Sequence, residues 1–470
     1  MEVSASEEPQ HGIWASIKEA ISGSHQDYTE GNLDRAVILL AIPMVLEMVM
    51  ESLLAVVDAF FVSGLGTDAV AAVALTESLL VILYAIAIGL SMSTTAMVAR
   101  RIGEKDREGA AIAAAQSILL GTLLSVAVAV IGVAFAPQLL RLMGGDEAVI
   151  RQGQTFTRTI LGANITIFLL FLNNAIFRGA GDAAIAMRAL WIANGVNIVL
   201  NPCLIRGLGP FPELGLLGSA VATTIGRGTG VVFQLWVLMS GSGRLSVGLK
   251  QFQLHLDVML RLLRVSLMGI LQFLISTSSW MGLVRIIATF GSSALAGYLF
   301  AIRVIVFAIL PSWGLCNAAA TLVGQNLGAG KPDRAEKSVW RAGLYNMAFL
   351  GLVSVIFIIF AEPIILIFTN EPAVIRHGVN CLRYVSYGYV FYAWGMVTVQ
   401  AFNGAGDTLT PTWINLACLW MFQIPMAWVL AKPMGLGPTG VFLGMTIAES
   451  VLAVVGIFAF RAGRWKKQQI

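Results

Sequence analysis

The first long apolar run of this chain carries three carboxylates, and that combination limits the folds open to it. The run covers Leu39–Ser63, which is enough to cross a bilayer, since about 20 apolar residues in a helix span the hydrocarbon core. Glu47, Glu51 and Asp58 project from one face of such a helix, at about 100° per residue. A charge facing lipid at the bilayer centre costs roughly 2.5–3.5 kcal/mol. The run therefore predicts a transmembrane helix whose acidic face lines a polar cavity inside a bundle.

Composition extends this prediction to the whole chain. Apolar residues make up 57% of the sequence and charged residues 12%, whereas a soluble domain carries about 25% charged residues. We therefore predict an all-α polytopic membrane protein. The net charge of +4 is small and indicates no nucleic-acid partner. The four cysteines and four histidines are scattered without the spacing of metal ligands, so we expect no metal centre among them.

Twelve apolar runs between residues 36 and 460 predict twelve transmembrane helices. The links between them alternate between basic and nearly uncharged, and the positive-inside rule places the basic links and both termini in the cytoplasm. Residues 1–34 precede the first span. In this segment Trp14, Ile17 and Ile21 recur at helical spacing, which is typical of a helix in the headgroup plane. An unstructured tail is the alternative.

The chain also repeats itself. The sequence FRGAGD at Phe177–Asp182 returns as FNGAGD at Phe402–Asp407, 225 residues later. Two six-helix lobes with the same cytoplasmic loops in the same order have the same topology, so a pseudo-two-fold axis along the membrane normal relates them. The predicted parts are a cytoplasmic N-terminal segment (1–34), an N-lobe (35–240), a cytoplasmic linker (241–264), a C-lobe (265–460) and a cytoplasmic tail (461–470).

Asp58 is the strongest candidate for chemistry, because a carboxylate inside a span can bind and release a proton or a cation. Glu47 and Glu51, with Met48 beside them, are candidates for the wall of a substrate cavity. The structural alternative is that these acids neutralise arginines elsewhere in the membrane. The arginines considered are Arg227, Arg285 and Arg303.

The fifth predicted span contributes a cluster of amides. Asn194, Asn197 and Asn201 lie three and four residues apart, which places them close together on a helix surface. Their oxygens, together with a carboxylate, suit Na⁺ or a hydrogen-bonded proton site. Hydrogen bonding between helices, which is common in membranes, is the equal alternative.

Several motifs are absent. The sequence GAGK at Gly328–Lys331 lacks the first glycine of a phosphate-binding loop, and Pro332 follows its lysine, so it indicates no nucleotide site. No nucleophile elbow and no HExxH motif occurs. We therefore expect a protein that is not an enzyme, whose transport is driven by an ion gradient.

Two segments resemble prokaryotic MATE (multidrug and toxic compound extrusion) transporters. They are TEGNLDRAVILLAIPMVLE…VVDAFFVSGLG, around the first span, and FAIRVIVFAILPSWGLCNAAATLVGQNLGAGKPDRA, across the eighth. The resemblance extends over residues 29–460. It implies twelve helices in two lobes, a place in the bacterial or archaeal inner membrane, and export of organic, often cationic, compounds against H⁺ or Na⁺. The chain is more similar to the DinF-like branch than to the NorM-like branch, because predicted spans 7 and 10 contain no Asp or Glu.

The resemblance also implies roles for single residues. By the family pattern Asn197, Asn201 and Thr223 join Asp58 in the coupling-cation site. Where some relatives carry Asp before the proline of span 5, this chain has Asn201, which favours H⁺ over Na⁺. Na⁺ at Asp58, Asn197 and Asn201 remains the alternative. Glu47, Glu51, Asn194 and Met48 are the expected substrate-cavity residues.

The expected partners are small organic substrates and the bilayer, with the transported ion in place of a cofactor and a functional monomer. The alternative function is flipping of a lipid-linked envelope precursor, which the same superfamily also performs. A flippase of this kind is expected to have an arginine-lined cavity for a pyrophosphate group.

Overall fold

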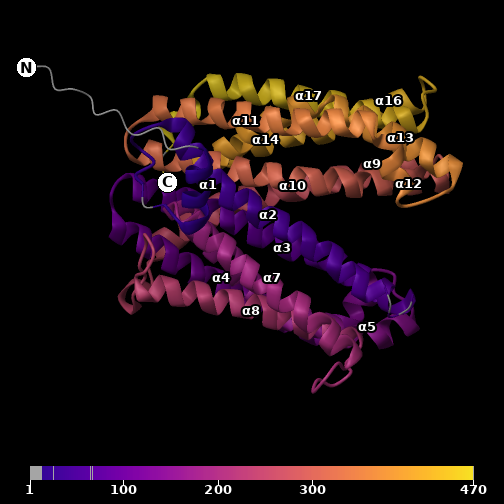
Figure 1. Ribbon diagram of the computed structural model, residues 1–470, viewed down its shortest axis with the longest axis horizontal. Coiled ribbons are helices and arrows are strands. Elements are labelled where there is room, and N and C mark those ends of the chain that lie inside the picture. The colour runs from indigo at the N-terminus through magenta and orange to yellow at the C-terminus, as the bar shows by residue number, and fades with distance from the viewer. Residues whose placement is uncertain (1–12, 25, 64, 66, 469) are drawn as a thin grey trace, which may run out of the picture.

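The computed structural model describes residues 13–24, 26–63, 65, 67–468 and 470 of the chain, and all the regular structure in these residues is helical (Figure 1). A short first helix, α1 (Ile13–Ser22), packs against the next helix through an ion pair of 2.7 Å between Glu19 and Arg35. Trp14 is 80% exposed on its outer side. The predicted N-terminal helix is thus present from residue 13, while residues 1–12 of that prediction lie outside the described residues.

The N-lobe follows the predicted order of spans. Its helices are α2 (Leu33–Ser63), α3 (Thr67–Gly103), α4 (Arg107–Leu142), α5 (Glu147–Gly162), α6 (Ile165–Ala180), α7 (Ala183–Arg206) and α8 (Leu216–Ser240). Side chains cap three of these helices: Asn32 accepts the Asp34 N–H at 2.9 Å, Asp106 accepts the Gly109 N–H at 2.8 Å, and Asp146 accepts the Val149 N–H at 2.8 Å. Each cap satisfies a backbone donor that the first turn of a helix leaves free.

The C-lobe repeats this order after a link that holds only a short helical turn, η1 (Leu249–Phe252). The first C-lobe helix begins at Leu256, so its first turns lie within the linker predicted for 241–264. Its helices are α9 (Leu256–Ala288), α10 (Ser292–Gly328), α11 (Pro332–Ile359), α12 (Ala361–Leu366), α13 (Pro372–Tyr387), α14 (Tyr389–Ala405), α15 (Leu409–Asn415), α16 (Ile424–Ala431), α17 (Pro438–Arg461) and a last turn η3 (Arg464–Lys467).

Ten helices in the described part of the chain are long and apolar enough to cross a membrane, and the bent pair α5–α6 makes an eleventh span. The pair α13–α14 occupies the repeat-equivalent place in the C-lobe and completes the twelve predicted spans. The predicted spans 155–176 and 380–402 are therefore each built from two helices, not one. Between α15 and α16, the segment η2 (Leu416–Gln423) winds as a π-helix, a rare form often found at functional sites.

The repeated GAGD motif has a structural cause. Gly181 and Gly406 end α6 and α14 with φ of +87° and +83°, a left-handed conformation that glycine adopts without steric cost. The same turn therefore closes the same helix in both lobes.

The contact between the lobes is also repeated. A Cβ on Gly89 of α3 would lie 2.7 Å from the backbone nitrogen of Ile270, and one on Gly314 of α10 would lie 2.5 Å from the carbonyl oxygen of Met44. Both contacts are related by the 225-residue offset of the repeat. They let α3 pack on α9, and α10 on α2, at backbone distance, as small residues allow between membrane helices. The lobes meet at the end of the molecule where α1 and the C-terminus lie and diverge toward the other end (Figure 1).

Candidate functional site

The carboxylate of Asp58 on α2 lies against α7 and α8. Asn201 donates its side-chain amide to Asp58 Oδ1 at 2.7 Å, and the Ser219 hydroxyl donates to the same oxygen at 3.3 Å. One turn away, the Asn197 amide donates to the Thr223 hydroxyl at 3.0 Å. The structure therefore brings together all four residues predicted for the coupling site. We refer to Asp58, Asn197, Asn201, Ser219 and Thr223 as the coupling cluster.

Ser219 is the member that sequence reasoning missed. It stands four residues before Thr223 on α8, so the two hydroxyls share one face of the helix. This four-residue spacing is the sequence feature from which Ser219 could have been predicted. Asp58 also forms no ion pair with Lys or Arg among the described residues, so the proposed pairing with Arg227, Arg285 or Arg303 is not seen.

Two amide oxygens in the coupling cluster are buried without a hydrogen-bond donor among the described residues. They are Oδ1 of Asn197 and Oδ1 of Asn201, on side chains that are 3% and 0% exposed. An unmade hydrogen bond at a buried acceptor costs about 1–3 kcal/mol. The two oxygens and the Asp58 carboxylate are hard donors that could ligate a small cation.

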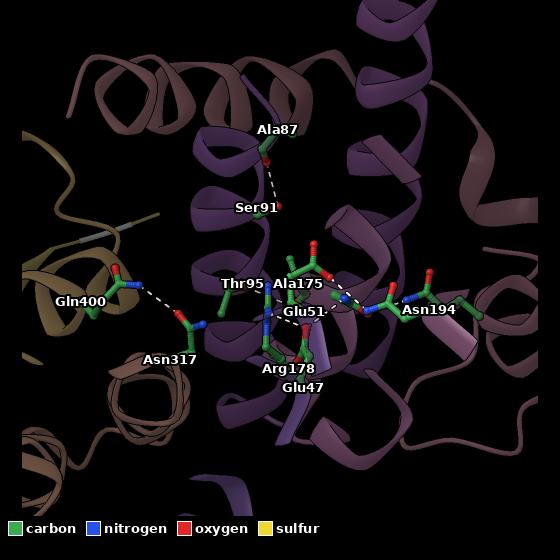
Figure 2. A network of polar contacts seen from close by, with 12 residues as sticks. Glu47, Glu51, Ala87, Ser91, Thr95, Ala175, Arg178, Asn194, Asn317 and Gln400 are labelled. Carbon is green, nitrogen blue, oxygen red and sulfur yellow. Dashed lines mark hydrogen bonds and ion pairs between the residues drawn. The ribbon is translucent and has the colours of Figure 1, made fainter. Parts of the chain in front are cut away.

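Glu51 and Glu47 lie closer than Asp58 to the N-terminal end of α2, and each has its own partner. The Asn194 amide donates to Glu51 Oε2 at 3.3 Å. Glu47, which is 1% exposed, pairs with Arg178 of α6 at 3.0 Å and accepts the Asn174 amide at 3.0 Å (Figure 2). The acidic face of α2 thus points into the N-lobe, as predicted.

The partner of Glu47 corrects the sequence interpretation. We expected Arg178 in a cytoplasmic loop and considered Arg227, Arg285 and Arg303 as counter-ions. The structure instead buries the Arg178 side chain to 11% exposure beside Glu47. Because α6 continues to Ala180, Arg178 lies in its last helical turn and not in a loop. From there its long side chain extends to the acid on the neighbouring helix α2.

A cavity of about 240 Å³ lies between the two lobes, and we call it the interlobe cavity. Glu47, Met48 and Glu51 line it, whereas Asn194 and the coupling cluster do not. Its charged walls are the two glutamates, Arg178 and Arg227. On the C-lobe side Asn317 accepts a hydrogen bond of 2.9 Å from the Gln400 amide (Figure 2). Further lining residues are Phe171, Asn174, Trp313 and Asn403.

The arrangement offers donors and acceptors for ions and small molecules. No group of three or more His, Cys, Asp or Glu side chains that could hold a metal ion occurs in the described ranges. The coupling cluster has one carboxylate, amides and hydroxyls, and the interlobe cavity has charges of both signs. Groups of these kinds can bind small ions and polar organic molecules.

Known proteins show the same organisation. The family described as MatE matches residues 43–203 and 269–429, one match in each lobe. The chain is 28% identical over 443 residues to the probable multidrug resistance protein YoeA of Bacillus subtilis, covering 93% of this chain and 95% of that one. It is 25% identical over 444 residues to the probable multidrug resistance protein NorM of Thermotoga maritima, covering 93% and 94% of the two chains.

A solved structure has the same fold. The outward-facing conformation of a multidrug resistance MATE family transporter of the MOP superfamily superposes with a TM-score of 0.87 at 27% identity, over 94% of this chain and 98% of that one. Since both lobes match one family over more than half of the chain, the protein belongs to the MATE family of secondary membrane transporters.

Proposed function

We propose that this protein exports organic cations and amphipathic compounds across the cytoplasmic membrane by alternating access, in exchange for H⁺. The observation that carries the proposal is the coupling cluster, a single carboxylate inside the N-lobe held by amide and hydroxyl donors and by no cationic side chain among the described residues. The names of the relatives support drug export as the task of this fold.

Protonation of Asp58 supplies the coupling step. The ionised carboxylate accepts from Asn201 and Ser219, which ties α2 to α7 and α8. A proton on Asp58 removes the charge that strengthens these bonds, so α2 is held less firmly. Pro43 interrupts the backbone hydrogen bonding of α2 and is the position where the helix can bend. Coupling follows because the two arrangements of α2 bind the proton with different affinity.

With the basic loops and both termini in the cytoplasm, the end where the lobes diverge faces outward. Protons then reach Asp58 from outside, and substrate leaves the interlobe cavity to the same side. The positive-inside rule supports this orientation. The links and tail assigned to the cytoplasm carry basic residues, among them Arg100, Arg101, Lys331 and Lys466.

Na⁺ is the second candidate ion, and one observation favours it. The two buried amide oxygens of Asn197 and Asn201 have no donor among the described residues, and with Asp58 they would offer three oxygen ligands. Na⁺ coupling would satisfy these oxygens directly. H⁺ coupling requires only one titratable group, Asp58. A cluster with a single carboxylate therefore favours H⁺ over Na⁺.

The flippase alternative predicts a positively charged cavity. In the interlobe cavity Arg178 is paired with Glu47, and Arg227 donates to the Tyr84 hydroxyl at 3.2 Å, with Glu51 also among the lining residues. Two arginines and two glutamates leave no excess of positive charge for a pyrophosphate. This balance favours an organic cation over a lipid-linked anion.

The test is dye efflux from proteoliposomes under an imposed pH gradient or Na⁺ gradient, for the wild type and Asp58→Asn. We expect efflux that follows the pH gradient and falls to background in the variant. Asp68→Asn is the matched control, because Asp68 is an exposed aspartate at the start of α3, and it should transport like the wild type. Efflux that requires Na⁺ would assign the ion to Na⁺, and no efflux under either gradient would refute drug export.

A further inference from the structure

A second cavity, of about 280 Å³, lies inside the C-lobe, and we call it the C-lobe cavity. It adjoins the interlobe cavity, since Met92, Trp313 and Gln400 line both. Glu449 of α17 is the only charged side chain among its described lining residues. The sequence prediction considered acids on spans 7 and 10 and overlooked this one, although it interrupts the last apolar run.

Glu449 has no counter-ion. In the part of the chain that the structure describes, no ion pair and no hydrogen bond reaches its carboxylate, in contrast to the paired Glu47. An uncompensated charge at this depth is costly, and such residues usually mark a substrate or ion pathway. The side chain is only half-buried because it faces the cavity. A bound cation would supply the missing charge.

Two further acceptors near Glu449 also lack donors. Gln272 and Asn415, each 5% exposed, line the C-lobe cavity, and Oε1 of Gln272 and Oδ1 of Asn415 have no hydrogen-bond donor among the described residues. The Asn415 amide nitrogen is already engaged, since it donates to the Ser276 hydroxyl at 3.2 Å. Both oxygens are covered in this conformation, so a side-chain rotation accompanies their use. A ligand with N–H groups would satisfy them.

Aromatic rings complete the site. Trp280 and Tyr392 line the C-lobe cavity and also a smaller cavity of about 30 Å³ that Glu449 lines as well. The π-helix η2 forms part of the wall through Leu419. Aromatic faces attract cations and pack against flat apolar bodies. Apart from its amide and hydroxyl side chains, the described wall is therefore apolar and aromatic around a single negative group.

We propose that the C-lobe cavity is a second binding site, for an aromatic compound that carries a protonated amine or amidine. Glu449 is the counter-charge, Gln272 and Asn415 accept its N–H groups, and Trp280 and Tyr392 hold its aromatic body. The inference rests on the proposed function in that it gives the exporter a second substrate site beside the interlobe cavity. The proposal depends on one observation: three acceptors that lack donors among the described residues line the same aromatic cavity.

The test is equilibrium binding to the purified protein in nanodiscs, followed by fluorescence polarisation. The probe is proflavine, an aromatic cation with amino N–H groups, and tetraphenylphosphonium, a cation without N–H groups, is the competitor. We expect two proflavine sites in the wild type, and in Glu449→Gln an affinity about tenfold lower at the second site. Glu449→Asp should retain both sites. Glu362→Gln, at an exposed acid on α12, is the matched control and should bind like the wild type.

Two more variants separate charge from hydrogen bonding. Asn415→Leu and Trp280→Leu should each weaken proflavine several-fold, and Asn415→Leu should leave tetraphenylphosphonium unchanged because that ion donates no hydrogen bond. Variants are compared only when their elution volume and melting temperature match the wild type. If Glu449→Gln folds and binds proflavine at both sites with the affinities of the wild type, the inference is wrong.

The same samples, assayed for efflux, keep the two proposals apart. Efflux with no effect of Glu449→Gln on binding would refute the second site and leave the exporter intact. Binding that depends on Glu449, without efflux under either gradient, would refute the exporter and leave the site. A wild type that neither binds nor transports the probes would refute both.

Discussion

The two lobes share their helix order but differ in their polar chemistry. By the 225-residue offset, Glu47 and Arg178 of the N-lobe correspond to Gln272 and Asn403 of the C-lobe. The N-lobe thus holds a buried ion pair of 3.0 Å, whereas the C-lobe has two neutral amides in the same places. Both members of the pair differ together, as expected when a single buried charge would be costly.

The coupling cluster shows the same contrast. By the same offset Asp58 corresponds to Leu283, an apolar residue. The glycines that begin α8 and α17, Gly215 and Gly437, lie 222 residues apart, so Glu449 corresponds to Arg227. The C-lobe therefore carries its acid on the last span and has no counterpart of the Asp58–Asn201 contact. The backbone contacts of Gly89 and Gly314 are nevertheless the same in both lobes. The glycine packing is common to the two halves, whereas the proposed coupling site lies in one of them.

The largest expected difference between the lobes concerns coupling. Asp58→Asn should reduce gradient-driven efflux to background, a loss of more than about tenfold, because no other carboxylate lies in the coupling cluster. Glu449→Gln should still follow the gradient but need roughly ten times more dye for half-maximal rate. Efflux from proteoliposomes over a range of dye concentrations measures both. Loss of gradient dependence in Glu449→Gln would place coupling in both lobes.

The buried ion pair gives the next largest effect. Glu47→Gln, which introduces the C-lobe residue, should lower the free energy of unfolding by about 3 kcal/mol, because Arg178 is left buried without its counter-ion. The double variant Glu47→Gln with Arg178→Asn restores the C-lobe combination and should lie within about 1 kcal/mol of the wild type. Thermal unfolding in detergent provides the comparison. Equal losses in the single and double variants would contradict the pairing.

The repeated glycine contacts predict equal effects in the two lobes. Gly89→Ala and Gly314→Ala should each lower the free energy of unfolding by about 1–3 kcal/mol, because the new Cβ atoms would lie 2.7 Å and 2.5 Å from backbone atoms of the other lobe. Gly351→Ala is the control, because nothing lies within 4 Å of its Cβ position, and a mid-helix alanine there should be neutral or stabilising. Melting temperatures that differ strongly between Gly89→Ala and Gly314→Ala would refute the equivalence of the two contacts.

The smallest effect concerns the aspartates of the two GAGD motifs. Asp182 pairs with Arg244 at 3.6 Å across the lobe, whereas the hydrogen bonds to Asp407 among the described residues come from Thr410 of its own turn, at 3.1 and 2.7 Å. Asp182→Asn should therefore cost about 2 kcal/mol and Asp407→Asn about 1 kcal/mol. Unfolding midpoints measured side by side test the difference, and a larger loss in Asp407→Asn would overturn it.

Much of the architecture could be predicted from local sequence. Apolar length gave the spans, the alternation of basic links gave the expected topology, and the FRGAGD and FNGAGD copies revealed the repeat. The three acids of the first span lie on one helical face, so their inward direction also followed from the sequence. These features depend on spacing along one helix or on composition, and both can be read from the sequence without knowledge of the fold.

Three features could not be predicted in this way. Arg178 looked like a loop residue because it precedes a glycine-rich turn, yet the long side chain returns into the N-lobe to reach Glu47. Spans 155–176 and 380–402 read as single apolar runs, and the structure bends each into two helices. Glu449 was visible in the sequence, but the role proposed for it depends on the cavity and on the side-chain oxygens of Gln272 and Asn415, which have no donor among the described residues.

The sequence by itself determined that the chain folds into membrane helices, that it folds as a repeat, and that the first helix keeps an acidic face away from lipid. Periodicity and transfer free energy act within a single helix, so they can be read without knowing the neighbours. The tertiary structure alone decided which acids are paired and which stand free. Pairing depends on side chains more than 100 residues apart meeting within about 3 Å, as Glu47 and Arg178 do, and only the packing of the helices fixes such distances.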